Sequence, residues 1–228
     1  MSDANRQAHW ENVYTTKGEK EVSWFQENPA PSLELIELTG LPEDAAIIDI
    51  GGGASRLVDN LLNRKFRRLT VLDLSGVALA AARERLGYSA ADVQWVIADV
   101  TKWEPSQAYD LWHDRAAFHF LTEEADQSAY ADRLKKAVKR GGHVIIGTFA
   151  PDGPERCSGL PIVRHDANTL ARILGGAFVL TDTRRHDHAT PWGAVQRFQF
   201  STFRREAGEV LTDIARTYNV SHSTISRL

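Results

Sequence analysis

The feature that most constrains the fold is a short apolar run that ends in three glycines. Residues 45–50 are apolar apart from Asp49, and Gly51-Gly52-Gly53 and a leucine-rich stretch of helical spacing follow them. A run of this length before glycines is typical of a strand that is buried on both faces of a parallel sheet. The glycines let the backbone turn sharply and approach a ligand. In open α/β sheets, ligands bind at this end of the strands.

The following chain alternates between strand and helix patterns. We expect strands over 69–74, 93–98, 109–112 and 143–149, and helices over 55–64, 76–86, from about Arg115, over 129–139 and over 168–174. Gly141-Gly142 is expected to cap the 129–139 helix in the left-handed region. Two extended runs, 178–186 and 195–203, flank a turn-rich segment and indicate an antiparallel hairpin. The chain is therefore predicted to be an α/β protein with a doubly wound, mostly parallel, seven-stranded sheet and a C-terminal antiparallel hairpin.

Composition limits the classes of partner and compartment. The chain has 228 residues, 43% of them hydrophobic, and a formal net charge of −3, so no overall basic field attracts nucleic acid. A single cysteine, Cys157, excludes an intramolecular disulfide. The polar N-terminus does not resemble a signal peptide, and no apolar run is long enough to span a membrane. We expect a cytoplasmic protein with a small-molecule partner and no membrane partner.

Acidic residues occur at the ends of three successive strands, where they can bind a nucleoside. Asp49 is suited to position an ammonium group, Asp73 can accept both hydroxyls of a ribose, and Asp99 can accept a hydrogen bond from an adenine amino group. A dinucleotide fingerprint starting at Gly51 would need glycine at position 56, which is Arg56. In the alternative interpretation the glycines only form a turn and the acids cap helices. Three such acids in series favour a ligand site.

With these motifs the chain resembles class I S-adenosylmethionine-dependent methyltransferases over about residues 8–205. Trp10-x-x-x-Tyr14 and Ser23-Trp24-Phe25 resemble a narrower group, which includes bacterial proteins of unassigned substrate and eukaryotic lysine methyltransferases that modify elongation factors or citrate synthase. The resemblance implies the Rossmann-like methyltransferase fold, with residues 1–28 as a lid over S-adenosylmethionine and 29–205 as the core. Aromatic faces attract a sulfonium cation, although these aromatic residues could instead pack an N-terminal helix onto the sheet. The expected cofactor contacts are Trp10, Tyr14, Trp24, Asp49, Gly51, Gly52, Gly53, Ser55, Asp73, Leu74, Asp99, Val100 and His113.

Two polar loops, after the fourth and fifth strands, are the candidate places for the chemistry. The first loop carries His113, Asp114 and His119, and a histidine can take a proton near neutral pH. Arg115 and His119 are four residues apart and share a face if a helix forms there. In the alternative interpretation Asp114 pairs with Arg115 or caps the helix, and the histidines are structural.

The second loop, residues 149–161, is rich in proline and glycine and is expected to lack regular structure. It carries Cys157, which either contacts a substrate or is an inert thiol. No histidine or cysteine spacing indicates a metal site, and no metal is expected. The candidate catalytic residues are therefore His113, Asp114, His119 and Cys157.

The final segment, 206–228, resembles the helix-turn-helix end of serine resolvases. It contains two basic residues, Arg216 and Arg227, so few phosphate contacts are expected. The segment could read DNA, pack as two amphipathic helices, or be a fusion remnant; we favour a remnant and do not expect nucleic acid to be a partner.

The sequence predicts an S-adenosylmethionine-dependent methyltransferase that acts on a small molecule in a closed pocket, with a thiol or a metalloid among the candidate acceptors. A protein lysine methyltransferase is the alternative within catalysis, and a DNA-binding regulator is the alternative from another class. The acceptor atom and the oligomeric state do not follow from the sequence.

Overall fold

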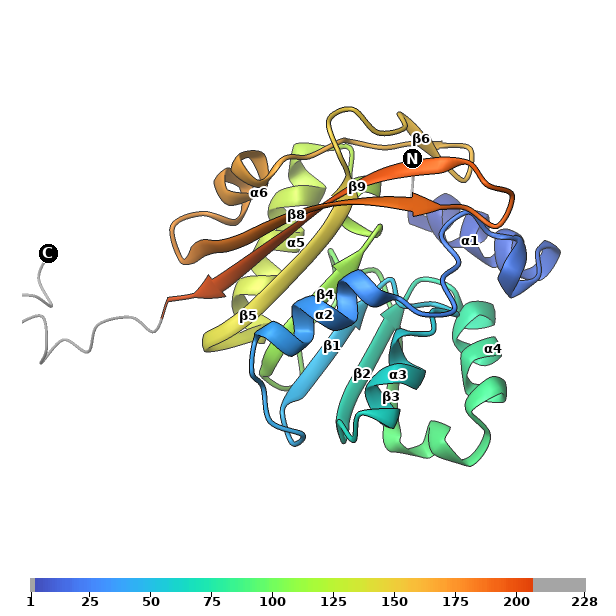
Figure 1. Cartoon of the computed structure of the whole chain (residues 1–228), viewed down its shortest axis with the longest axis horizontal. Coiled ribbons are helices and arrows are strands. Elements are labelled where there is room, and N and C mark those ends of the chain that lie inside the picture. The colour runs from blue at the N-terminus through green and yellow to red at the C-terminus, as the bar shows by residue number, and fades with distance from the viewer. Residues whose placement is uncertain (1–2, 207–228) are drawn as a thin grey trace, which may run out of the picture.

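The computed structural model describes residues 3–206, and a seven-stranded sheet with the order β3-β2-β1-β4-β5-β9-β8 forms its centre (Figure 1). Five strands pair in parallel, and β9 and β8 add an antiparallel hairpin to β5. This arrangement confirms the predicted fold. The bounds are β1 (Ala46–Ile50), β2 (Arg68–Asp73), β3 (Val93–Ile97), β4 (Tyr109–Arg115), β5 (Val138–Phe149), β8 (Phe178–Ala189) and β9 (Val195–Arg205). Apart from residue 206, the predicted tail lies outside the described residues.

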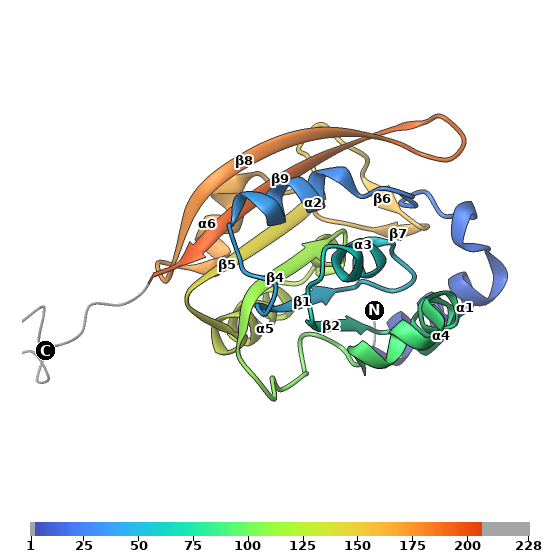
Figure 2. The ribbon, with the colours of Figure 1, turned by 60° about the horizontal axis from the view of Figure 1, so that its bottom comes forward.

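Successive residues of a buried strand point to opposite faces of the sheet, so both faces carry apolar side chains. Helices cover both faces. Ile48 packs in one apolar cluster with α5 and α6, and Ile47 packs in the other with α2 and α3. The helix α1 packs against α4 at the edge of the sheet (Figure 2). The bounds are α1 (Asp3–Thr16), η1 (Glu19–Glu21), α2 (Ala30–Leu38), α3 (Leu57–Asn63), α4 (Gly76–Leu86), η2 (Gly87–Asp92), η3 (Phe118–Phe120), α5 (Glu124–Ala137) and α6 (Ala167–Leu174).

The prediction that Gly141-Gly142 caps a helix is wrong. The helix α5 ends at Ala137, and β5 runs from Val138 through both glycines. Opposite them the pairing with β4 is irregular between Tyr109 and Leu111, and Gly141 has φ 75°. The glycines therefore allow an irregular step inside a buried strand, where a side chain would be strained.

Two further local predictions are wrong. No helix begins at Arg115, because β4 continues to that residue and is followed by the short helix η3. Arg115 and His119 therefore do not share a helix face. The 149–161 loop contains regular structure, namely the small hairpin of β6 (Arg156–Cys157) and β7 (Leu160–Pro161).

In the described part of the chain, none of the helices has both the length and the apolar character that crossing a membrane would need.

Candidate functional site

The glycine loop that follows β1 packs closely against residues of β1 and β2. The Gly51 N–H donates to the Leu72 carbonyl at 2.7 Å, and Gly51 has φ 64°, a region that favours glycine. A Cβ on Gly52 would lie 2.6 Å from Asp49 Oδ2 and 2.6 Å from Val71 Cγ1. The loop therefore needs glycine both for its conformation and for its close approach to β1 and β2.

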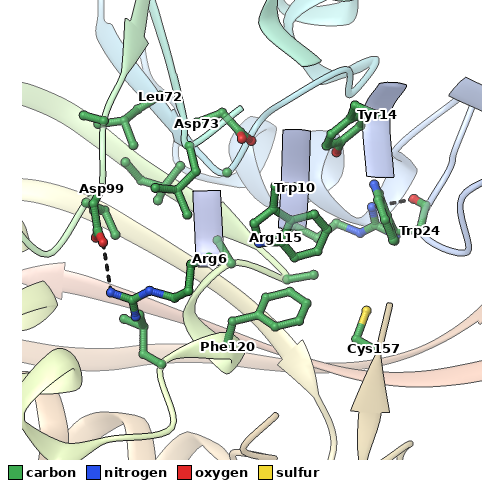
Figure 3. A pocket seen from close by; sticks show the side chains of 18 residues that line it. Arg6, Trp10, Tyr14, Trp24, Leu72, Asp73, Asp99, Arg115, Phe120 and Cys157 are labelled. Atoms are coloured by element: carbon green, nitrogen blue, oxygen red, sulfur yellow. Dashed lines mark hydrogen bonds and ion pairs between the residues drawn. The ribbon is translucent and has the colours of Figure 1, made fainter. Parts of the chain in front are cut away.

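A cavity opens beside this loop, where the carboxyl ends of β1, β2, β3 and β4 meet (Figure 3). Including the open space at its mouth, the cavity has a volume of about 780 Å³. Its lining residues come from the N-terminal segment, from these strand ends and from the loop that carries β6. They are Arg6, Trp10, Tyr14, Trp24, Ile50, Gly51, Leu72, Asp73, Leu74, Ala98, Asp99, Val100, Arg115, Ala116, Ala117, Phe120, Leu121 and Cys157.

Two of the predicted nucleoside-binding acids, Asp73 and Asp99, line this cavity together. Asp73 is almost fully buried, and Ser75 N–H donates to its Oδ1 at 2.8 Å. Burial raises the pKa of Asp73 to about 7, against the hydrogen bonds from Ser75 and Gly53, and the nearby charge of Asp49 adds to the rise. The other acid, Asp99, accepts from the N–H and hydroxyl of Thr101 at 2.9 and 2.7 Å.

The N-terminal segment forms an aromatic wall of the cavity. The ring centroid of Trp10 lies 5.7 Å from Trp24 and 4.9 Å from Phe120, and Tyr14 lies 6.2 Å from Trp24. These pairs have the edge-to-face geometry that aromatic rings prefer. Trp10 and Tyr14 lie on α1 and line the cavity, while their predicted contact with the cofactor stays a prediction.

Contacts of three charged side chains attach the N-terminal segment to the core. The carboxylate of Glu11 accepts from the N–H groups of Gly76 and Val77 at the start of α4, at 2.8 and 3.1 Å. Such a carboxylate at a helix N-terminus satisfies free N–H groups and interacts favourably with the helix dipole. Arg6 pairs with Asp99 at 2.9 Å, and Glu19 pairs with Arg56 at 2.7 Å.

The candidates Asp49 and His113 form a buried pair beneath the loop and are not among the residues that line the cavity. They are register partners on β1 and β4, and His113 Nδ1 lies 2.7 Å from Asp49 Oδ1. The other ring nitrogen of His113 lies 2.8 Å from Ser32 Oγ on α2. The pair therefore supports the glycine loop from below.

Asp114 is fully buried and organises the turn that follows β4. Its Oδ1 accepts from the N–H groups of Ala117 and Phe118 at 3.0 and 3.2 Å, and its Oδ2 accepts from the Tyr130 hydroxyl at 2.8 Å. Tyr130 in turn accepts from Trp112 Nε1 at 2.7 Å. Burial raises the pKa of Asp114 to about 6, against these hydrogen bonds. Asp114 does not pair with Arg115, and it closes the turn instead.

The remaining candidates, His119 and Cys157, differ in their access to the cavity. His119 is fully buried behind Phe120, and burial lowers its pKa to about 3, so its ring is neutral. Cys157 lines the cavity, but burial raises the pKa of its thiol to about 12, so it is not a thiolate. Within residues 3–206, no three His, Cys, Asp or Glu side chains gather in a way that could hold a metal.

Sequence reasoning did not identify Arg6 and Arg115 as cavity residues. The position of Arg115 near the carboxyl end of a strand was the available signal, because ligands of open α/β sheets bind at this edge. For Arg6 the sequence carried no signal, since its partners Asp99 and Asp126 lie on distant segments. Ser55 accepts from the Leu57 N–H at 3.1 Å, two residues before α3 begins, and is not among the residues that line the cavity.

Comparison with known proteins agrees with this geometry. Residues 47–142 match the family model described as "Methyltransferase domain". The matched segment runs from β1 into β5 and includes the glycine loop and both cavity acids.

A curated relative of this domain is trans-aconitate 2-methyltransferase of Variovorax paradoxus (strain S110). It is 31% identical over 131 residues, which are 57% of this chain and 47% of the relative. The chain thus matches about half the length of such relatives.

Solved structures share the fold over most of the chain. N-methyltransferase NodS from Bradyrhizobium japonicum WM9, in complex with S-adenosyl-L-homocysteine, has a TM-score of 0.65 at 17% identity and covers 86% of this chain and 97% of its own. The 1,6-didemethyltoxoflavin-N1-methyltransferase from Burkholderia thailandensis has a TM-score of 0.64 at 20% identity and covers 90% of this chain and 91% of its own. The chain therefore has the Rossmann-like methyltransferase fold.

Proposed function

We propose that this chain transfers a methyl group from S-adenosylmethionine to a small-molecule acceptor. The observation that carries the proposal is the convergence of Gly51, Asp73 and Asp99 with the aromatic residues Trp10 and Trp24 on one cavity. These residues come from separate segments, and each has a matching group in this cofactor.

The residues fit the cofactor in shape and charge. The glycine loop leaves no room for a Cβ beside Asp49, so backbone can approach the amino acid end closely. Asp73 would accept the ribose hydroxyls and Asp99 the adenine amino group, with Leu74 and Val100 beside the base and ribose. The His113–Asp49 pair and Ser55 would hold the loop in place. The N-terminal segment, residues 1–28, would act as the lid of the 29–205 core.

The bound cofactor supplies an electrophilic methyl group that is activated by its positive charge. The work of the protein is then to align the acceptor with that methyl group and to exclude water. Trp10, Trp24 and Phe120 suit water exclusion, and Cys157 would contact the acceptor as a neutral thiol. The buried Asp114 and His119 would act by positioning the loop after β4.

The names of similar proteins state small acceptors, among them trans-aconitate and 1,6-didemethyltoxoflavin. We extend this class to the present chain, and the aromatic wall over the cavity favours it over a lysine of a folded protein. A thiol or metalloid is a competing acceptor class within the same proposal.

Isothermal titration with S-adenosylhomocysteine tests the proposal. We expect binding to wild type, and a loss of about tenfold or more in affinity for Asp99→Asn, which removes a charged acceptor. Asp92→Asn, an exposed acid on η2, is the matched control and should bind as wild type does. Failure of wild type to bind would contradict the proposed function.

A further inference from the structure

The two cations that line the cavity have different surroundings. Arg6 pairs with Asp99 at 2.9 Å and with Asp126 at 2.8 Å. Arg115, by contrast, has no carboxylate in ion-pair contact among residues 3–206. Figure 3 shows the two arginines apart in the cavity, with Arg6 turned toward Asp99 and Arg115 lying near Trp10 and Trp24.

Arg115 is held in place without being neutralised. Its Nη1 donates to the Trp24 carbonyl at 3.0 Å, and its guanidinium carbon lies 5.1 Å from the ring centroid of Phe198. Its Nη2 is buried, with no hydrogen-bond partner in the described chain. Burial lowers the pKa of Arg115 to about 10, against the charge of Asp49, which acts on Arg115 without an ion-pair contact; Arg115 therefore stays charged at neutral pH.

A buried N–H without a partner and a buried cation without a carboxylate in contact both cost free energy. An anionic ligand in the cavity would relieve both costs at once. It would also offset the repulsion between Arg115 and a cofactor sulfonium, which would place a second positive charge in the same cavity.

We propose that the methyl acceptor is a small carboxylic acid whose carboxylate pairs with Arg115. This inference rests on the proposed function and names its substrate class. A carboxylate matches a single guanidinium with a free N–H, whereas a doubly charged phosphate would meet, among the described lining residues, one arginine without a carboxylate in contact. The neighbouring Trp10, Trp24 and Phe120 suit the apolar body of an organic acid.

The titratable groups of the cavity favour the same class. The described lining includes no histidine or lysine, its acids Asp73 and Asp99 are assigned to the cofactor in the proposed function, and the Cys157 thiol is protonated. An acceptor that must lose a proton would lack an evident base, whereas a carboxylate is already deprotonated at neutral pH. One carboxylate oxygen forms the new bond to the methyl carbon, and the S–C bond breaks with its electron pair left on sulfur. The products are a methyl ester and neutral S-adenosylhomocysteine, and no proton moves.

The test uses acids and their primary amides as matched probes: benzoate and benzamide, malonate and malonamide, indole-3-acetate and indole-3-acetamide, with trans-aconitate as a larger acid. Formation of S-adenosylhomocysteine gives kcat/KM for each probe, and titration gives the affinity of each probe for the full chain loaded with S-adenosylhomocysteine. Mass spectrometry and mild alkaline hydrolysis identify a methyl ester. The proteins are wild type, Arg115→Gln, Arg115→Lys and the control Arg64→Gln, a surface arginine paired with Glu37.

We expect at least one acid to be methylated with kcat/KM about 100-fold above that of its amide, and the product to be an ester. Arg115→Gln should lower that kcat/KM about 100-fold and keep the affinity for S-adenosylhomocysteine within about twofold. Arg115→Lys should retain part of the activity, since it keeps the charge but not the forked donors. The control should match wild type.

Three results would overturn the inference and leave the proposed function standing. The first is a neutral or cationic best acceptor, or a methyl group found on nitrogen or sulfur. The second is a tenfold or greater loss of S-adenosylhomocysteine affinity in Arg115→Gln, which would assign Arg115 to the carboxylate of the cofactor. The third is an S-adenosylhomocysteine-loaded wild type that neither binds nor methylates any acid of the series. Failure to bind S-adenosylhomocysteine at all would instead refute the proposed function.

Discussion

Cofactor binding should depend on pH through the buried carboxyl of Asp73. This group is 8% exposed, and burial raises its pKa from 3.8 to about 7. In the proposed function it accepts two ribose hydroxyls, and an ionised carboxylate does so about twice as strongly as a neutral one. Binding therefore favours the ionised form, and below pH 7 it must remove a proton first.

The magnitude follows from the pKa. At pH 6 about one Asp73 in ten is ionised, so the Kd for S-adenosylhomocysteine should be about tenfold weaker than its plateau above pH 8. Isothermal titration between about pH 5.5 and 8.5 measures this. Asp73→Asn should bind about 10- to 100-fold more weakly at pH 8, because it loses the charged acceptor, and its pH profile should be nearly flat.

The same group gives stability a pH dependence of the opposite sense. Between pH 3.8 and about 7 the folded state keeps a proton that the unfolded state has lost. The free energy of unfolding should therefore fall as pH rises through this window, by roughly 4 kcal/mol at most, and Asp73→Asn should remove this part of the slope. The reasoning is refuted if wild-type affinity is constant from pH 6 to 8, or if Asp73→Asn keeps the wild-type profile.

Three further predictions concern the stability of the folded chain. Gly52→Ala would place its Cβ 2.6 Å from a carboxylate oxygen and from a valine methyl group, and should lower the free energy of unfolding, measured in urea, by about 1–3 kcal/mol. In the control Gly176→Ala the new Cβ meets no atom within 4 Å, and the free energy of unfolding should change by less than about 1 kcal/mol. Tyr130→Phe removes the hydrogen bonds to Trp112 and Asp114 and should lower the free energy of unfolding by about 1–3 kcal/mol. The control Tyr88→Phe changes a fully exposed side chain and should leave stability unchanged. Equal shifts in melting temperature for the two variants would contradict a stabilising role of these hydrogen bonds. Glu11→Gln removes the charge at the start of α4 and should cost about 0.5–1 kcal/mol, less at high salt; a loss unaffected by salt would show that the dipole is not its source.

The fold and the cavity acids were predictable because they follow from order along the chain. An apolar run, a glycine loop and an acid at each of the next two strand ends specify parallel strands whose carboxyl ends meet. Asp73 and Asp99 are 26 residues apart, yet both line one cavity for this reason. Residues 47–142 match the model described as "Methyltransferase domain", in line with the resemblance to methyltransferases, whereas the narrower resemblance to lysine methyltransferases stays a prediction.

The roles of buried polar residues were not predictable, because they depend on partners that sequence spacing does not reveal. His113 lies between Asp49 on the neighbouring strand and Ser32, which precedes it by 81 residues. A histidine in a polar loop looks the same in the sequence whether it faces a ligand or such partners. Gly141 gave a similar ambiguity, since a positive φ suits both a helix cap and an irregular strand.

Arg6 and Arg115 line the same cavity but have different roles, and the fold explains the difference. Arg6 belongs to α1, and its two carboxylate partners make its charge part of the attachment of the N-terminal segment. Arg115 ends β4, so the rigid sheet fixes its backbone, while Trp24 from the N-terminal segment fixes one of its N–H groups. A cation that is positioned from two sides, and that has no carboxylate in contact among residues 3–206, is suited to pair with an anionic ligand. For this reason we place the acceptor at Arg115 and the adenine of the cofactor at Asp99.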